Sequence, residues 1–176
     1  GGSDDFSLEV LNDYYRRGYI DCFVSEKDNG IFDAMNKGAK LARGEFLFYL
    51  NTDDFLVDDS ILVKVYDFMC KDSFSHDIYY GDLLMVDREN SRRIIRNWKH
   101  YGGEQKKLIR GGQITQPSAF IRRSIFKDIS FNTEYKIASD FDFFLRCHLN
   151  GCTFSHIPIY TTKMRVGGAS NGNLNK

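Results

Sequence analysis

The residues from Glu45 to Asp54 (EFLFYLNTDD) constrain the fold more than any other part of this 176-residue sequence. Six mostly aromatic and aliphatic residues follow Gly44, a pattern typical of a strand buried on both faces of a sheet that is covered by helices. Two carboxylates, Asp53 and Asp54, stand where that strand ends. In open α/β sheets the ligand crevice lies beyond the carboxyl ends of the strands, so these acids are placed to meet a ligand or a metal ion. An isolated acidic pair is also compatible with a simple turn that closes the strand.

The composition fits one α/β domain and excludes several classes of function. Hydrophobic residues make up 42% of the chain and aromatic residues 15%, enough for a sizeable core. The 24 basic and 24 acidic residues cancel, so charge gives no reason to expect nucleic acid or an anionic membrane as the main partner. The clusters Arg92-Arg93 and Arg122-Arg123 are interpreted as solvated surface. The four cysteines lack zinc-ligand spacing, and no apolar run approaches the ~20 residues of a membrane span, so we expect a cytoplasmic protein with peripheral contact at the inner face of the cell membrane at most.

A strand, a loop and a helix are expected before the central strand. Residues 20–24 are β-prone, residues 25–30 are polar, and residues 31–41 carry apolar side chains at helical spacing. In such a βαβ unit the strands are parallel, so Asp28 in the first loop should face the same crevice as Asp53 and Asp54. Residues 1–5 (GGSDD) have the composition of a loop with no strand before it. A first strand and helix are therefore expected upstream, unless Gly-Gly-Ser is a linker.

The rest of the chain is predicted to complete a mixed sheet. We expect a helix over 58–70, a hairpin formed by 78–86 and 93–98, a strand over 119–121, a helix over 137–149 and a final strand over 152–160. Paired glycines at 102–103 and 111–112 flank a short basic helix, which is either a mobile lid or ordinary helix punctuation. The polar, glycine-rich tail after residue 166 is predicted to be mobile.

The last predicted helix opens with the sequence IASDFDFFLR. Ser139 and Asp142 are spaced like a capping box, and Asp142 can pair with Arg146 one turn later. Asp140 lies about 200° around the helix from Asp142, so these two carboxylates point apart and cannot act as a close pair. Asp140 is thus either a first-turn acid favoured by the helix dipole or a lone carboxylate with a chemical role. His156 has no carboxylate or second histidine near it in sequence and is interpreted as a packed strand residue rather than a metal ligand.

Together these features resemble the family 2 glycosyltransferases of the GT-A fold, inverting enzymes that use nucleotide-sugar donors to build bacterial surface polysaccharides. SEKDNGIFDAMNKGAKLARGEFLFYLNTDD, residues 25–54, is very similar to the family's central signature, and QPSAFIRRSIF with YKIASDFDFFLR is similar to its acceptor-side half. The resemblance covers nearly the whole chain as a single domain, with residues 1–54 as the nucleotide-sugar and metal half and residues 55–176 as the acceptor half. It implies an α/β GT-A fold with a mixed, mostly parallel sheet flanked by helices, whose first βα unit is missing.

The resemblance also implies a set of functional residues. Asn51 through Asp54 matches the family's DXD-type metal site, with Asp53 and Asp54 as ligands of Mn²⁺ or Mg²⁺ on the donor diphosphate. Asp140 matches the general base that deprotonates the acceptor hydroxyl for in-line attack with inversion. The positions matched to substrate binding are Asp28, Asn36, Asn51, Gln116 and Arg146.

Three departures from the family pattern leave the acceptor undefined. Ser139 stands where glutamate is common, Asn51 where DXD proper has aspartate, and Thr115 where a histidine often precedes the glutamine. The expected partners are a nucleotide-sugar donor, with a UDP-sugar favoured, and a glycan or lipid-linked acceptor. Because the missing strand carries part of the family's nucleotide pocket, we expect the chain as given to be incomplete for donor binding.

Two other interpretations stay open. One is a non-catalytic nucleotide- or carbohydrate-binding module of the same fold, which would show no turnover. The other is a nucleotidyltransferase, which could also use strand-end acids and Mg²⁺. That class needs a glycine-rich phosphate loop bearing Arg or Lys, and we find none in the sequence.

Overall fold

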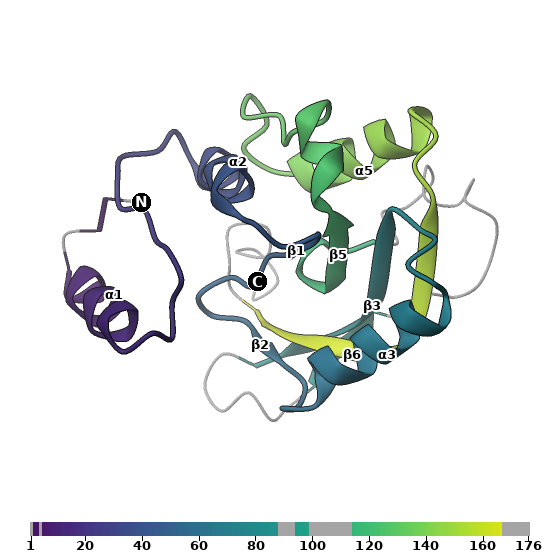
Figure 1. Ribbon diagram of the computed structural model, residues 1–176, viewed down its shortest axis with the longest axis horizontal. Coiled ribbons are helices and arrows are strands. Elements are labelled where there is room, and N and C mark those ends of the chain that lie inside the picture. Colours follow the sequence, from purple (N-terminus) through teal and green to yellow (C-terminus); the bar gives the residue numbers. More distant parts are fainter. Residues whose placement is uncertain (1, 4, 88–93, 99–113, 167–176) are drawn as a thin grey trace.

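The computed structural model describes residues 2–3, 5–87, 94–98 and 114–166. In these residues a mixed sheet is flanked by helices, which confirms the predicted α/β class (Figure 1). The strands are β1 (Phe46–Phe48), β2 (Phe55–Leu56), β3 (Ile78–Val86), β4 (Ile94–Trp98), β5 (Ala119–Arg122) and β6 (Phe154–Arg165). The helices are α1 (Ser7–Arg16), α2 (Ile31–Leu41), α3 (Ile61–Lys71) and α5 (Ser139–Leu149), with the 3-10 helices η2 (Gln116–Ser118) and η3 (Arg123–Lys127).

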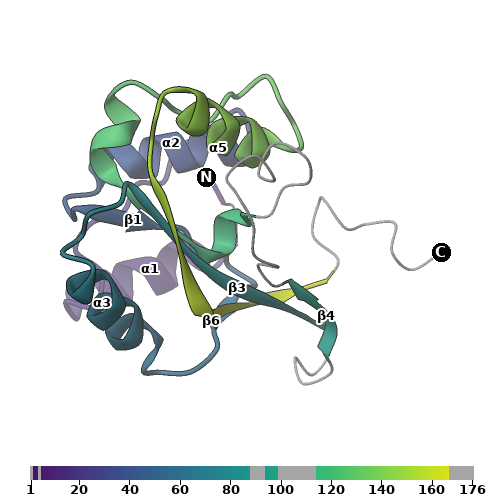
Figure 2. The same cartoon turned by 90° about the vertical axis from the view of Figure 1, so that its right-hand side faces the viewer.

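The sheet runs in the order β1-β5-β3-β6-β2, with β4 paired to β3 (Figure 2). The predicted hairpin is confirmed, because β3 and β4 pair antiparallel with Leu83 opposite Trp98. Three further pairs are antiparallel: β1 with β5, β2 with β6, and β3 with β5. Only β3 and β6 pair in parallel among the described strands. The sheet is therefore mixed as predicted, but antiparallel pairings outnumber parallel ones in the part of the chain that is described.

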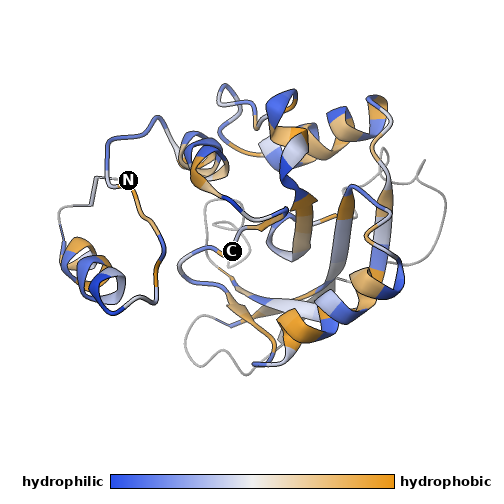
Figure 3. Ribbon diagram, viewed as in Figure 1, coloured by the Kyte–Doolittle hydropathy of each residue, from blue (hydrophilic) through white to orange (hydrophobic). Residues whose placement is uncertain are grey.

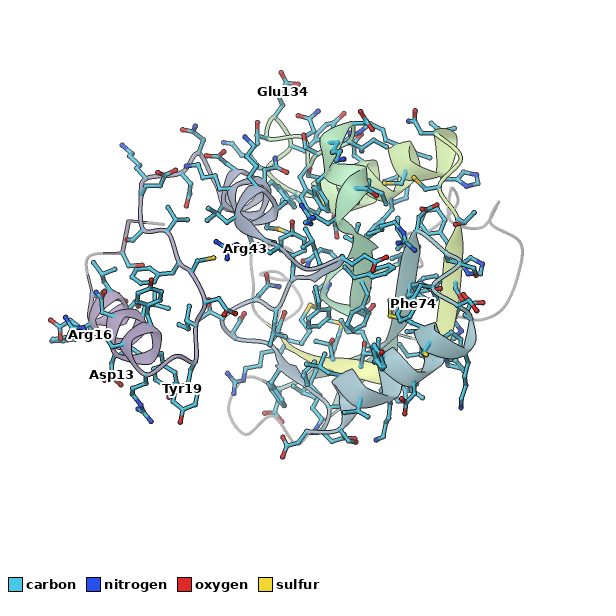
Figure 4. All side chains as sticks on the ribbon, in the orientation of Figure 1. Asp13, Arg16, Tyr19, Arg43, Phe74 and Glu134 are labelled. Carbon is cyan, nitrogen blue, oxygen red and sulfur yellow. The ribbon has the colours of Figure 1, made fainter. Side chains whose placement is uncertain are left out.

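The segment before α2 differs from the prediction. Residues 20–24 form no strand, so the expected βαβ unit is not built, and β1 pairs antiparallel with β5 instead. A β-prone run needs a partner for its backbone hydrogen bonds, and none pairs with this one among the described residues. α1 has no buried residue and lies apart from the sheet, with Asp13, Arg16 and Tyr19 extending outward (Figures 1 and 4).

One hydrophobic core lies between the sheet and α2, η3 and α5. Alternate strand residues point to the same face, and those that reach this core are Ile78, Tyr80, Ala119 and Ile121. The helices contribute Met35, Ile125, Phe143, Phe144 and Cys147. Figure 3 shows hydrophobic residues along α5 and on β5, which lies beneath it.

A second core covers the other face of the sheet. Here α3 packs Ile61, Val65 and Met69 against Tyr79, Phe120 and Ile157. Tyr79 and Tyr80 are neighbours on β3 yet belong to different cores, and all nine residues of that strand are buried. The molecule therefore has three layers, with β3 at the centre of the middle one. No helix in the described ranges is both long and apolar enough to cross a bilayer.

Arg122 is not the solvated surface residue that was predicted. Its guanidinium donates to the carbonyl oxygens of Phe74 and His76 and forms an ion pair with Glu45. It also lies over the ring of Phe46, 4.5 Å from the ring centre. Arg122 thus ties β5 to the loop after α3, where Phe74 lies (Figure 4). The predicted basic helix, its flanking glycine pairs, the hairpin turn and the C-terminal tail lie outside the described residues.

Candidate functional site

The acidic segment from Asn51 to Asp54 forms a tight turn between β1 and β2. The backbone amide of Asp54 donates to the carbonyl of Asn51 at 3.0 Å, and the side-chain amide of Asn51 donates to the Asp54 carboxylate at 2.8 Å. Asp53 is exposed, whereas Asp54 is buried with 8% of its surface accessible. The strand expected over residues 45–50 is shorter than predicted, since β1 ends at Phe48, and both acids lie in the turn that follows it. This turn separates one solvated carboxylate from one desolvated carboxylate.

The surroundings of Asp54 disfavour its ionised form. Burial raises the pKa of this carboxyl, and the neighbouring Asp53 charge raises it further, while the hydrogen bond from Asn51 and the contacts of Arg165 lower it in part. A positive ion beside these two acids would relieve that electrostatic cost. Mg²⁺ and Mn²⁺ fit, because such ions take one or two protein carboxylates and complete their shells with water and substrate phosphate.

Asp28 lies outside the acidic turn. It lies in the loop before α2, where its carboxylate accepts a hydrogen bond from the amide of Gly30 at 3.1 Å. In the residues that the structure describes, no three His, Cys, Asp or Glu side chains are grouped to hold a metal ion, so Asp28 does not join Asp53 and Asp54 in such a cluster. The prediction that these acids face one crevice depended on a strand over residues 20–24, and that strand is not formed.

Gln116 is bonded to the segment that leads into the acidic turn. Its side-chain amide donates to the carbonyl of Tyr49 at 3.1 Å, and Gln116 itself is 6% exposed. The next residue, Pro117, accepts a hydrogen bond from the Thr162 hydroxyl of β6 at 2.7 Å. Gln116 is therefore held between the end of β1 and β6, close in the fold to the residues that precede Asn51.

Two other predicted substrate-binding residues are hydrogen-bonded to other parts of the protein. The Asn36 side chain donates to the carbonyl of Phe131 at 2.8 Å and accepts from its amide at 3.0 Å. Arg146 donates to the carboxylate of Asp142 at 2.8 Å, which confirms the predicted pair, and to the carbonyl of Ser130 at 2.6 Å. These bonds fasten α2 and α5 to residues 130–131, so we assign both side chains a positioning role.

Asp140 lies half-buried in the first turn of α5. The predicted capping box is wrong. Ala138 precedes the helix with a φ of 66°, and the hydroxyl of Ser139 donates to the carbonyl of Asn132 at 2.8 Å instead of capping an amide. Asp142 forms an ion pair with Arg146, and Asp140 is the other acid in the first turn of α5.

A row of aromatic rings joins the helix of Asp140 to the strand of the acidic turn. Phe143 stacks on Phe131 with ring centres 4.5 Å apart, and Phe131 meets the ring of Tyr49 edge-on at 5.8 Å. Asp140 is three residues before Phe143 and so lies on the same side of α5. Tyr49 is two residues before Asn51. The aromatic cluster therefore packs α5 against the residue that follows β1, in the segment that leads into the acidic turn.

His156 lies in a strand, β6, as predicted, and it meets a carboxylate that is far from it in sequence. Nε2 of His156 lies 2.9 Å from Oδ1 of Asp82, a residue 74 positions away that is 8% exposed. The parallel pairing of β3 and β6 brings the two together and also sets Tyr80 opposite His156. Burial raises the pKa of Tyr80 to about 12. No local sequence signal could have linked these positions, because the contact depends on strand order.

Sequence reasoning also missed two basic residues near the acidic turn. Lys163 and Arg165 of β6 both lie over the ring of Phe55, the residue after Asp54. A signal for them exists in the sequence, since two basic side chains at alternate positions of a strand share a face. Only the pairing of β6 with β2 shows which residues they meet.

The fold and the site define an α/β protein with paired acids at the end of a strand in a three-layer domain. The family model for glycosyl transferase family 2 matches residues 1–130, a span that contains Asp28, Asn36, the acidic turn and Gln116. The chain belongs to this family. Asp140 lies beyond the matched span.

Two relatives that are about 30% identical support the same assignment. A "PGL/p-HBAD biosynthesis glycosyltransferase" of Mycobacterium bovis is 31% identical over 183 residues, which cover 100% of this chain and 67% of that protein. A "Chondroitin synthase" of Escherichia coli is 30% identical over 163 residues, which cover 89% of this chain and 22% of that protein. The crystal structure of HddC from Yersinia pseudotuberculosis matches 88% of this chain and 66% of its own at 12% identity, with a TM-score of 0.42.

Proposed function

We propose that this chain is a metal-dependent, inverting glycosyltransferase. It would move a hexosyl or N-acetylhexosaminyl group from a nucleotide-sugar donor, such as a UDP-sugar, to a hydroxyl of a glycan or lipid-linked acceptor in cell-surface polysaccharide synthesis. The observation that carries this proposal is the turn from Asn51 to Asp54, where an exposed and a buried carboxylate adjoin in a segment matched to the family. The names of the relatives agree with sugar transfer.

The donor half is assigned to residues 1–54. Asp53 and Asp54 would hold Mn²⁺ or Mg²⁺, and Asn51 orients Asp54 through its 2.8 Å hydrogen bond. A bound cation supplies positive charge that offsets the charge developing on the departing diphosphate. Asp28 would contact the nucleotide from the loop before α2.

The acceptor half is assigned to residues 55–176, with Asp140 as the general base. Its carboxylate takes the proton of the acceptor hydroxyl while that oxygen attacks the anomeric carbon opposite the leaving diphosphate, so the configuration inverts. Phe143 fixes this part of α5 in the core, and Arg146 holds the helix to Ser130. Gln116 would position substrate from beside the end of β1.

The assignment of Asp140 is tested by the variant Asp140→Asn. It should abolish sugar transfer, measured as release of nucleoside diphosphate with acceptor present, while Mn²⁺-dependent nucleotide binding stays intact. Asp59→Asn, an exposed acid before α3, is the matched control and should keep full activity. Transfer that persists in Asp140→Asn at the wild-type rate would contradict the assignment.

The donor is identified first, by thermal unfolding with a panel of nucleotide sugars and Mn²⁺. A ligand at 100 times its dissociation constant adds about 2.7 kcal/mol to the free energy of unfolding, which gives a clear shift in melting temperature. Binding without transfer to any acceptor would favour the non-catalytic module. With the panel measured on the full-length protein, no metal-dependent shift with any nucleotide sugar would contradict the proposed donor site.

A further inference from the structure

The C-terminal end of α5 places two cysteines side by side. The backbone amide of Cys152 donates to the carbonyl of Cys147 at 3.0 Å, and that of Gly151 donates to the carbonyl of His148 at 3.0 Å. Because Gly151 has a φ of 82°, these bonds form a Schellman motif, the left-handed turn that often ends a helix. The side chains at the two ends of this motif commonly contact each other. In this protein both of those residues are cysteines.

One hydrophobic core receives both side chains. Cys147 is fully buried in the core between the sheet and α5, and Cys152 is partly buried and packs against the same cluster. A disulfide needs Cα atoms that are about 4.4–6.8 Å apart. The 3.0 Å backbone hydrogen bond between the two residues keeps their Cα atoms near this range. The pair can therefore be bridged without moving α5 away from β6, which begins at Phe154 (Figure 1).

The surroundings of the two thiols give them different roles. Burial raises the pKa of the Cys147 thiol, and the neighbouring Cys152 sulfur raises it further. Burial and the nearby Asp77 charge raise the pKa of Cys152, whereas its interaction with Cys147 lowers it in part. Only the thiolate form attacks a disulfide. Cys152 reaches solvent and Cys147 does not, so Cys152 is the thiol that a reagent from solution meets first.

We propose that Cys147 and Cys152 form a reversible dithiol–disulfide site that reacts with small disulfides such as oxidised glutathione. The thiolate of Cys152 attacks one sulfur of the small disulfide, and a mixed disulfide forms as the first small thiolate leaves. The thiolate of Cys147 then attacks the sulfur of Cys152, and the second small thiolate leaves. The two cysteines lose two protons and two electrons in total, and the small disulfide is reduced to two thiols.

The product of this reaction fastens the end of α5 to the segment that enters β6. The new bond closes the loop over residues 147–152, around a turn that backbone hydrogen bonds already hold. Cross-linking removes freedom from the unfolded chain, so a bond that fits the native geometry raises the melting temperature. Thiols whose pKa is raised react slowly, so the reaction should become faster as the pH rises. None of these steps uses the residues assigned to sugar transfer.

The test measures disulfide formation in folded protein that carries Cys22→Ser and Cys70→Ser, since these two other cysteines are exposed and would react by themselves. This background protein is incubated with oxidised glutathione at about pH 8.5, where thiolates are more abundant, and is then measured by mass spectrometry. The matched variants on this background are Cys147→Ala, which lacks the second thiol to react, and Cys152→Ala, which lacks the first. Circular dichroism checks that each variant is folded.

We expect the background protein to lose both remaining thiols, to retain no glutathione and to form an internal bond in the peptide that contains Cys147 and Cys152. Its melting temperature should rise by about 5 °C on oxidation and return to its first value with dithiothreitol. Cys147→Ala should retain one glutathione on Cys152, and Cys152→Ala should stay unmodified at the buried Cys147.

Three results would overturn the proposal: glutathione that stays on Cys152 while Cys147 is intact, two thiols that remain unreacted, or a fall in melting temperature on oxidation. The measurement on the background protein changes neither Cys147 nor Cys152, so a folding defect in a variant cannot hide the result.

Discussion

Replacing Gly81 with alanine should destabilise the centre of the sheet through one identifiable clash. A Cβ atom at this position would lie 2.3 Å from the γ-methyl of Thr161, 2.8 Å from its hydroxyl oxygen and 3.0 Å from the carbonyl oxygen of Ile159. The backbone at Gly81 does not adopt a positive φ, so alanine adds no conformational strain of its own. The steric overlap with β6 alone should set the cost.

The size of the effect follows from how tightly Thr161 is held. Its side chain is fully buried and donates to the carbonyl of Asp82 at 3.3 Å, in the irregular stretch where β3 and β6 shift register. Overpacking a rigid core costs about 1–3 kcal/mol, and a contact this short belongs at the upper end. We therefore expect Gly81→Ala to lower the free energy of unfolding by about 3 kcal/mol.

A second substitution tests whether this clash is the cause. Thr161→Ala removes both side-chain atoms that meet the new methyl group and should cost about 1–2 kcal/mol by itself, for a lost methyl and a lost hydrogen bond. The double variant should be about 1 kcal/mol less stable than Thr161→Ala, because the added methyl group fills the vacated space but still lies 3.0 Å from the carbonyl oxygen of Ile159. The two substitutions would thus be coupled by about 2 kcal/mol.

Urea unfolding followed by circular dichroism measures all four proteins of this cycle. Gly38→Ala is the control, since Gly38 lies in α2 with no atom within 4 Å of its added Cβ, and it should stabilise the protein by about 0.5–1 kcal/mol. Additive losses in the double variant, or a loss below about 0.5 kcal/mol for Gly81→Ala, would refute the steric reasoning.

Three further predictions follow from single side chains. Asn36→Ala should lower the free energy of unfolding by about 2–4 kcal/mol, because the buried amide and carbonyl of Phe131 lose their partner; a loss below about 1 kcal/mol in urea would contradict this. Hydrogen bonds, the strongest from the hydroxyl of Tyr79, lower the pKa of Asp72 to about 2, against about 4 in an unfolded chain. The ionised carboxylate of Asp72 thus stabilises the fold above about pH 4, and this contribution is lost as the pH falls to about 2. The difference in melting temperature between the wild type and Asp72→Asn should therefore shrink over that range. A difference that stays constant would contradict the prediction. Asp54→Asn should abolish the rise in melting temperature that Mn²⁺ produces in the wild type, and an unchanged rise would remove Asp54 from the metal site.

Local patterns in the sequence determined much of this protein. Residues 31–41 form α2 with the predicted bounds, and residues 78–86 pair with β4 as predicted, because helical spacing and hairpin turns are encoded by near neighbours. The sequence also predicted that Asp53 and Asp54 follow a strand, although β1 ends earlier than expected, at Phe48. It predicted the ion pair of Asp142 with Arg146 too, because that pair depends only on the geometry of one helix.

The tertiary structure alone decided which distant side chains meet. Asn36 bonds to a residue 95 positions away, and the contact of Asp82 with His156 spans 74 positions. Residues 20–24 have the composition of a strand but remain unpaired, because β-propensity becomes structure only when a partner strand is in place. Strand order and register arise from burial across the whole chain, and they set the surroundings of each polar group, whereas local spacing sets only the element that carries it.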